Sequence, residues 1–256
     1  MPFVESDGIN IYYEVEGEGP SLMLHHGQSG NLKVFRHFGY TERLRQQYQL
    51  ILIDARGHGR SDKPHEVDAY RLKNFVNDAV AVLDELGVER SHFLGYSMGG
   101  SVGLGIGVYS PNRFKSLIIG GMGMAEMDSE EEIKRSQDLI ELYREGMEAV
   151  VAMFERSGGV SSPEIREDTM RNDPKALIAL CSVREHIGFM DLLPSLELPC
   201  LFYAGDQDYY HQKSKETAEL IPKARFVSLP GLGHFLPPRQ SDLVLPHVLR
   251  FLADIS

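Results

Sequence analysis

Tryptophan is absent from this 256-residue sequence, and only two cysteines occur, Cys181 and Cys200. Two cysteines are too few for a disulfide scaffold, so we expect both to be reduced and buried. No apolar run approaches the roughly 18 residues that a membrane-crossing helix requires. The first residues lack the basic and apolar regions of a secretory signal, and we therefore expect a cytoplasmic location.

Positive charge is also scarce. Lysine and arginine total 26 against 37 aspartates and glutamates, which gives a formal net charge of −11. This balance repels phosphate backbones and anionic lipid surfaces, so we expect neither nucleic-acid nor membrane partners. Adjacent His25 and His26 and the scattered carboxylates show no metal-ligand spacing, and we expect no metal and no cofactor. A small-molecule substrate is the expected partner, and the oligomeric state cannot be read from the sequence.

Alternating strand and helix patterns predict the fold. Residues 9–15 alternate apolar and polar side chains, which is typical of a half-exposed strand, and Asp7-Gly8 predicts a hairpin turn before it. Short continuous apolar runs, typical of strands covered on both faces, occupy residues 22–24, 50–53, 92–94, 117–119 and 200–203. A helical pattern over residues 72–86 ends at Gly87. The order predicts a doubly wound α/β fold: a mostly parallel central sheet with helices on both faces.

This alternation stops over residues 123–198, where helical patterns replace strands. Ser129 and Glu132 form a capping-box pattern before apolar residues that continue to Phe154, and a second helix is predicted over 176–185. We interpret 123–198 as a helical cap inserted into a core of residues 1–122 and 199–256. A long crossover connection is the alternative.

The sequence Gly95-Tyr96-Ser97-Met98-Gly99 fits the pattern G-x-S-x-G. A predicted strand precedes it and a run of small residues typical of a closely packed helix follows, as in a nucleophile elbow. There the serine occupies a strained turn, and the flanking glycines let neighbouring backbone approach. We therefore predict that Ser97 is a catalytic nucleophile.

A serine hydroxyl needs a base to remove its proton, and in this architecture an acid and then a histidine follow the serine in the chain. The histidines after Ser97 are His186, His211, His234 and His247. His234 is favoured because it lies in a Gly-rich loop directly after the apolar strand pattern of residues 226–229, where α/β sheets keep their active sites. His247 fits a terminal amphipathic helix, His186 the cap and His211 a helix start.

Two aspartates compete for the role of the acid in Gly205-Asp206-Gln207-Asp208, which follows another predicted strand. Turn aspartates often bond only local backbone, so one of them is expected to be structural. We favour Asp208, which lies further into the loop. The preceding strand ends in residues 120–123, which offer no carboxylate.

Attack on a carbonyl creates an oxyanion that needs two N–H donors. We predict the backbone N–H of Met98, after the nucleophile, and that of Gln28 in the loop His26-Gly27-Gln28-Ser29-Gly30. The alternative for the Gln28 loop is an ordinary Gly-rich turn between a strand and a helix.

Together these segments resemble the α/β-hydrolase superfamily of serine hydrolases, in its esterase- and lactonase-like branch with a helical cap. The matching motifs are His26-Gly27, residues 54–61 (DARGHGRS), the Ser97 elbow, the Asp208 loop and Gly233-His234, in the expected order over almost the whole chain. The resemblance implies that the insertion covers the active site. It also implies that residues 54–61 form a structural turn in which His58 packs or hydrogen-bonds.

The resemblance also sets some branches aside. Haloalkane dehalogenases and soluble epoxide hydrolases use an aspartate nucleophile where this chain has Ser97. Dehalogenases also bind halide through tryptophan, which is absent here. Proline iminopeptidases typically place tryptophan beside the nucleophile, at the position of Met98.

We therefore predict a serine hydrolase that cleaves a carboxylic ester or lactone through an acyl-enzyme on Ser97. The alternatives are C–C bond hydrolysis of a diketone, acyl or peracid transfer, and a non-catalytic ligand-binding protein on the same scaffold. A diketone hydrolase would need cations for a substrate carboxylate, which the insertion offers in Arg144, Arg156, Arg166, Arg171 and Arg184. Apolar residues of the insertion either line an acyl pocket or form its own core: Met147, Met153, Phe154, Met170, Phe189 and Met190.

Overall fold

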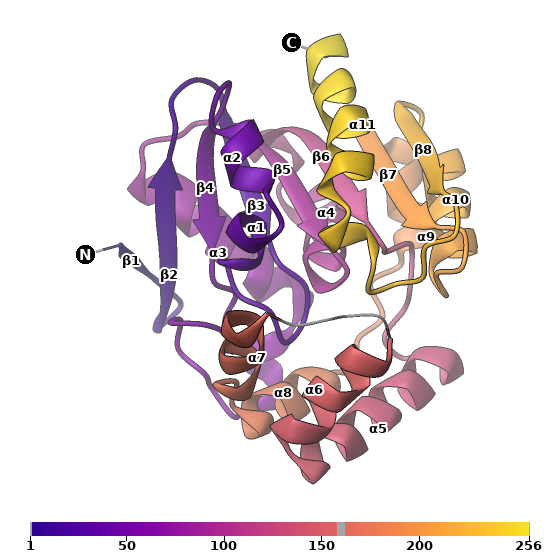
Figure 1. The fold of residues 1–256 in the computed structure, drawn as a ribbon. Coiled ribbons are helices and arrows are strands. Elements are labelled where there is room, and N and C mark those ends of the chain that lie inside the picture. The colour runs from indigo at the N-terminus through magenta and orange to yellow at the C-terminus, as the bar shows by residue number, and fades with distance from the viewer. Residues whose placement is uncertain (1, 158–161, 256) are drawn as a thin grey trace.

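A computed structural model of the chain describes residues 2–157 and 162–255. The described strands form one eight-stranded sheet in the order β1-β2-β4-β3-β5-β6-β7-β8 (Figure 1). They are β1 (Phe3–Ser6), β2 (Ile9–Glu16), β3 (Ser21–His25), β4 (Gln49–Ile53), β5 (Ser91–Tyr96), β6 (Phe114–Gly120), β7 (Cys200–Gly205) and β8 (Ala224–Leu229). The helices are α1 (Val34–His37), α2 (Tyr40–Leu44), α3 (Leu72–Glu85), α4 (Met98–Tyr109), α5 (Glu130–Glu145), α6 (Met147–Arg156), α7 (Pro163–Met170), α8 (Pro174–Cys181), α9 (Phe189–Leu192), α10 (His211–Leu220) and α11 (Ser241–Asp254).

The sheet begins with the expected hairpin. Asp7 and Gly8 both have positive φ, 52° and 78°, the backbone of the tight turn that asparagine, aspartate and glycine favour. Strand β2 runs antiparallel to β1 and to β4, and from β4 to β8 every pair of neighbours is parallel. The expected mostly parallel sheet is confirmed.

Helices cover both faces of the sheet because successive strand residues point to opposite sides. On β3, Met23 packs in a core with residues of α3 and α4, whereas Leu22 and Leu24 pack in a second core with residues of α2 and α11. The apolar strand runs in the sequence are therefore buried on both sides, and the doubly wound α/β fold is confirmed.

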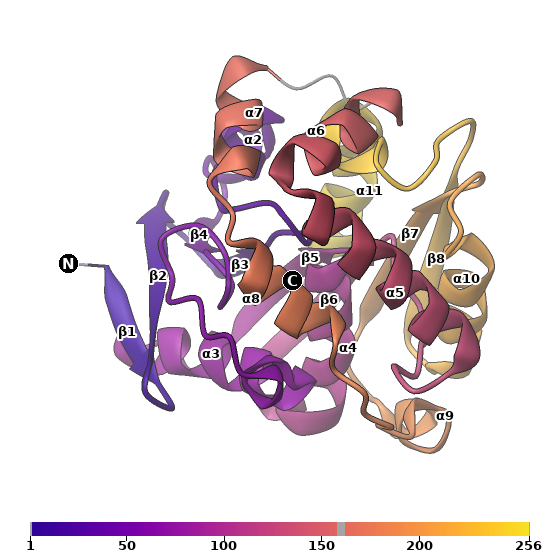
Figure 2. The same cartoon turned by 90° about the horizontal axis from the view of Figure 1, so that it is seen from below.

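Helices α5 to α9 lie between β6 and β7 in the chain, and α5 to α8 gather below the sheet in Figure 1, whereas α9 lies beside α10. Seen from that side, α5, α6 and α8 cross in front of the strands (Figure 2). They share a small core of their own, which includes Tyr143, Met147, Val150, Leu177 and Cys181. Among the described residues, no helix is both long and apolar enough to cross a bilayer.

Two details of this helical segment differ from the sequence expectations. The helix predicted from Ser129 to Phe154 is interrupted at Gly146, whose φ of 101° ends α5 and redirects the chain into α6. The Ser129 hydroxyl does accept from the N–H of Glu132, at 3.4 Å. The Glu132 carboxylate, however, points into the protein toward Tyr210 and Lys213, so the second half of the capping box is absent.

The second predicted helix, over residues 176–185, is shifted. It is α8, which starts at Pro174, with Asp173 as its N-cap, and ends at Cys181. The Asp173 carboxylate accepts from the N–H groups of Lys175 and Ala176. Aspartate followed by proline at the first helical position is a strong start signal, and it places the helix two residues earlier than the apolar pattern alone indicates.

Candidate active site

Ser97 lies on a strained turn between β5 and α4. Its φ and ψ are 54° and −112°, a backbone conformation that non-glycine residues rarely adopt. The flanking glycines permit it, because a Cβ on Gly95 would overlap the carbonyl of Gly99, and one on Gly99 would overlap the carbonyl of His25. Such strain persists only where the surrounding structure holds it in place.

The three predicted catalytic side chains form one hydrogen-bonded chain. Ser97 Oγ lies 2.9 Å from Nε2 of His234, and Nδ1 of His234 lies 3.0 and 2.9 Å from the two carboxylate oxygens of Asp208. His234 and Asp208 are each 6% exposed, so water competes little for these bonds. Because an ionised carboxylate only accepts, Nδ1 carries the proton, which leaves Nε2 to accept the Ser97 proton.

The two aspartates of the β7–α10 loop have different partners. Asp206 accepts from the backbone N–H of Gly231 at 2.8 Å and so ties its own loop to the loop that carries His234. Asp208 faces His234 and also accepts from the N–H of Tyr210 at 2.8 Å. The structure thus places the structural contact on Asp206 and the histidine contact on Asp208, as the sequence analysis favoured.

The other candidate histidines lie elsewhere. His211 is the first residue of α10 and bonds Ser228 through Nε2 at 2.8 Å. His247 is exposed on α11, and His186 is also exposed and faces Asp128 outside the cavities. None of these three rings approaches Ser97 in the described structure.

Two tyrosines hold His234, and the sequence analysis missed both. Tyr209 lies flat against its ring, with centroids 4.4 Å apart and planes 30° apart. Tyr96, directly before the nucleophile, donates its hydroxyl to the backbone carbonyl of His234 at 2.5 Å. Their positions next to Asp208 and Ser97 in the chain are the only signal that could have indicated them.

The loop that carries Gln28 packs directly against the elbow. A Cβ on Gly27 would lie 3.3 Å from the carbonyl oxygen of Tyr96 and 3.6 Å from the Ser97 Cβ, so a side chain there would require a shift of a few tenths of an ångström. The backbone N–H groups of Gln28 and Met98 donate to no other described residue. Neither of these two N–H groups is therefore used by a hydrogen bond within the described structure.

Buried neutral histidines brace this loop. Burial holds the pKa of His58 well below its usual range, and burial also lowers the pKa of His26. A neutral His58 bonds the Arg56 carbonyl through Nδ1 and accepts from the N–H of Ser29 through Nε2, at 3.2 Å. His26 likewise accepts from the N–H of Ala55, at 3.1 Å. The expected structural role of His58 is therefore specific: it holds the residue after Gln28.

Two cavities meet at Ser97. The larger, about 200 Å³, reaches past His234 and is bounded by apolar side chains such as Val34, Phe154 and Phe235; we call it the His234-side cavity. The smaller, about 150 Å³, extends over Met98 toward Met122, and we call it the Met98-side cavity. Four residues line both: Gln28, Ser97, Leu139 and Tyr209.

Only some of the apolar residues singled out between 123 and 198 reach these cavities. Met153 and Phe154 line the His234-side cavity, and Phe189 lines the Met98-side cavity. Met147 and Met170 pack in the core of the helical segment instead, and Met190 is 56% exposed.

The arginines considered for a substrate carboxylate do not line either cavity in the described part of the chain. Arg144, Arg166 and Arg171 pair with glutamates, and Arg184 donates to backbone carbonyls. Arg239 lines the His234-side cavity, and another arginine that sequence reasoning missed, Arg135, lines the Met98-side cavity. Arg135 pairs with Glu131 and stacks on Tyr209, with its guanidinium carbon 4.2 Å from the ring centroid.

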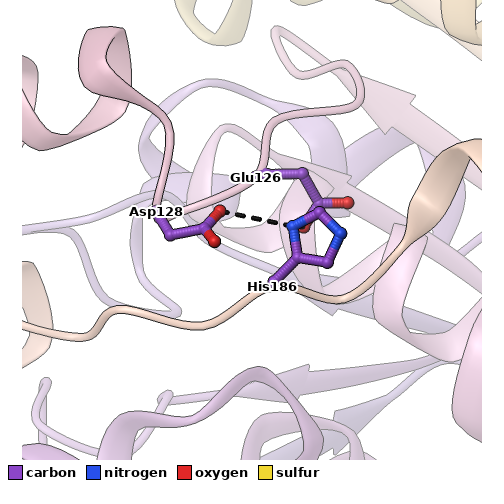
Figure 3. A group of neighbouring side chains, drawn as sticks. All are labelled: Glu126, Asp128 and His186. Atoms are coloured by element: carbon purple, nitrogen blue, oxygen red, sulfur yellow. Dashed lines mark hydrogen bonds and ion pairs between the residues drawn. The ribbon is translucent and has the colours of Figure 1, made fainter.

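One group of possible metal ligands occurs among the described residues: Glu126, Asp128 and His186, on the outside of the helical segment (Figure 3). Both Glu126 oxygens, however, already accept backbone N–H bonds of 2.7 to 2.9 Å from residues 187–189. Because these bonds use the oxygens that a cation would need, Glu126 is better explained as an anchor for the loop before α9.

Comparison with known proteins agrees with this architecture. Residues 20–158, more than half of the chain, match the model of the family described as the alpha/beta hydrolase fold. The chain is 27% identical to 3-oxoadipate enol-lactonase 2 of Acinetobacter baylyi over 75% of its length and 73% of the relative's. It is 24% identical to a bifunctional esterase/perhydrolase of Acinetobacter calcoaceticus, over 96% and 97% of the two chains. A hydrolase from Pseudomonas aeruginosa PA01 superposes with a TM-score of 0.84 at 25% identity, covering 98% of this chain and 97% of the other.

Proposed function

The chain belongs to the α/β-hydrolase fold family, and on this basis we propose that it is a serine hydrolase that cleaves a carboxylic ester or lactone. The observation that carries the proposal is the hydrogen-bonded chain from Ser97 through His234 to Asp208, with Ser97 facing two cavities. The enol-lactonase and the esterase/perhydrolase among its relatives support the ester or lactone class.

In the proposed reaction, Ser97 Oγ attacks the substrate carbonyl carbon as its proton passes to Nε2 of His234. The Asp208 carboxylate stabilises the resulting imidazolium and holds its orientation. Backbone N–H groups of Gln28 and Met98 receive the oxyanion. The bond to the leaving oxygen then breaks as His234 returns the proton to it. Water, with His234 again as the base, attacks the acyl-enzyme and releases the acid and free Ser97.

The positions of the cavities support a placement of the two parts of the substrate. His234 must protonate the leaving oxygen, so the alcohol side belongs in the apolar His234-side cavity. The acyl group then occupies the Met98-side cavity, whose volume of about 150 Å³ favours a short or medium chain. Residues 123–198 act as the cap in this proposal, and residues 1–122 and 199–256 form the core that it covers.

The test is hydrolysis of p-nitrophenyl acetate and butyrate, a panel of lactones, and a vinylogous diketone. We expect ester or lactone turnover that Ser97→Ala abolishes. Turnover of the diketone alone would favour C–C hydrolysis, and oxidation products formed only with peroxide and a carboxylic acid would favour peracid transfer. Wild type and Ser97→Ala that are equally inert on every substrate would contradict the proposal and favour the non-catalytic scaffold.

A further inference from the structure

Tyr143, on α5, bonds the loop that carries the proposed oxyanion donor Gln28. Its side chain is 3% exposed, and its hydroxyl lies 2.9 Å from Nε2 of Gln28 and 2.9 Å from Oγ of Ser29. Tyr143 follows Ser29 by 114 positions and Gln28 by 115 positions in the sequence. A helix outside the sheet therefore contacts the residue that we propose as an oxyanion donor.

Both hydrogens of the Gln28 side-chain Nε2 are directed at this helical segment. One Nε2 hydrogen goes to the Tyr143 hydroxyl, and the other goes to Sγ of Cys181 on α8, at 3.0 Å. Burial raises the pKa of the Cys181 thiol to about 11, and burial also raises the pKa of the Tyr143 phenol. Both groups are therefore neutral at neutral pH, and the Tyr143 phenol and the Ser29 hydroxyl share one hydrogen bond in which either is a competent donor.

Ser29 shows why the loop needs this support. Its φ of 62° lies in the left-handed region, which costs a residue with a Cβ more than it costs glycine. All three of its polar groups are held: the N–H by His58, the carbonyl by the side chain of Asn172 at 2.9 Å, and the hydroxyl by Tyr143. A strained residue persists where its surroundings over-determine it, and here two of the three supports come from between β6 and β7.

We propose that Tyr143 is a positioning residue that holds the Gln28 N–H toward the oxyanion at Ser97. The Tyr143 hydroxyl holds the side chain of Gln28 and the Oγ of Ser29, and the backbone N–H of Gln28 therefore keeps one direction. Tyr143 also lines the His234-side cavity, but its hydroxyl is bonded to Gln28 and Ser29, so the role we assign to that hydroxyl is to position the donor. The inference rests on the proposed function, because it assigns the oxyanion donor of that same site.

The expected effect of losing this support follows from what a donor is worth. Removing an oxyanion donor outright typically lowers the rate by about 10²–10³-fold. Tyr143→Phe leaves the donor in place but held by fewer hydrogen bonds, so we expect kcat to fall by about ten- to a hundredfold. The KM should stay within about twofold, since an interaction made mainly in the transition state acts on kcat.

The test compares Tyr143→Phe with Tyr48→Phe, a matched change at a buried tyrosine that lines neither cavity. The fraction of reactive Ser97, counted by titration with a p-nitrophenyl phosphonate, corrects kcat for misfolded protein.

Butylboronic acid, which forms a tetrahedral adduct on serine, should bind Tyr143→Phe more weakly by the same factor as kcat/KM falls. The pH profile should keep the wild-type midpoint because His234 and Asp208 are untouched. Unchanged kcat and unchanged boronate affinity would overturn the inference.

A double-mutant cycle with Gln28→Met, which keeps the length of the side chain but removes its N–H donors, tests the route. If Tyr143 acts through Gln28, the double variant should be no more than about twofold slower than Tyr143→Phe alone. Multiplicative losses would contradict that route and overturn the inference.

A readout independent of turnover separates this inference from the proposed function. Backbone amides of residues 26–30 should exchange hydrogen with solvent faster in Tyr143→Phe than in wild type and Tyr48→Phe. An inert wild type would sink the proposed function, whereas an unchanged exchange rate would sink the positioning role of Tyr143.

Discussion

The ring of Tyr209 stacks on the imidazole of His234, with their centroids 4.4 Å apart. The guanidinium of Arg135 lies over the same Tyr209 ring, with its central carbon 4.2 Å from the ring centroid. Arg135 belongs to α5, and Tyr209 directly follows Asp208 in the chain. The same helix that carries Tyr143 toward the Gln28 loop therefore also packs against the side chain that steadies His234. Both halves of the proposed catalytic machinery are in contact with α5.

Removing the stacked ring should slow the reaction moderately. Aromatic pairs contribute about 0.5–1.5 kcal/mol beyond the area they bury, so we expect Tyr209→Leu to lower kcat/KM about three- to tenfold. Tyr209→Phe keeps the ring and should stay within about twofold of wild type. Steady-state ester hydrolysis measures both. A Tyr209→Phe variant as slow as Tyr209→Leu would show that the hydroxyl, rather than the stacking, matters.

The two loop aspartates offer a matched pair of substitutions. Asp208→Asn should lower kcat by about 10³–10⁴-fold, because an amide no longer requires the proton on Nδ1 and favours the wrong histidine tautomer. Asp206→Asn keeps an oxygen that accepts from the Gly231 N–H, and its kcat should change less than about threefold. Equal losses in the two variants would contradict the assignment of the acid to Asp208.

Stability should fall as the pH drops below about 6.5. Burial lowers the pKa of His25 to about 3 and that of His92 to about 4, and it lowers those of His26 and His58 as well. Below pH 6.5 these histidines bind protons in the unfolded chain but stay unprotonated in the folded protein. Each therefore reduces the free energy of unfolding by up to about 1.4 kcal/mol per pH unit until its folded pKa is reached.

Urea unfolding between pH 8 and pH 5 measures this slope. His92 is a suitable probe because it bonds Ser116, away from both cavities. His92→Gln should make the dependence shallower by about one histidine's share. An identical slope in the variant would mean that His92 does not carry its part of the pH dependence.

The ion pair of Arg56 and Asp78 should be critical for stability. The two side chains are each 2% exposed and share two hydrogen bonds of 2.7 and 2.6 Å. Asp78→Asn leaves the Arg56 charge buried without a counter-charge and should lower the free energy of unfolding by about 3–5 kcal/mol. The double change Arg56→Met and Asp78→Leu should recover much of that loss in urea unfolding. A double variant with a lower free energy of unfolding than Asp78→Asn would refute this electrostatic account.

Much of the fold could be predicted because its signals are local. Apolar runs such as Leu50–Ile53 mark strands buried on both faces, and Asp7-Gly8 has the backbone freedom that the observed hairpin turn uses. Helix ends were less certain where two signals competed. Gly146 ended a helix that the apolar spacing alone extended to Phe154, and Asp173-Pro174 started α8 earlier than its apolar residues indicated.

The sequence by itself determined the residue types of the candidate site, because a serine between glycines after a strand, and loops bearing Asp208 and His234, each have local patterns. Only the tertiary structure decided which neighbours act on them. Tyr209, Arg135 and Tyr143 carry no motif, and their contacts with His234 and Gln28 arise from segments that meet solely through packing. Hydrogen bonds and ring contacts depend on distances of a few ångströms between side chains, and the order of residues in the sequence does not specify these distances.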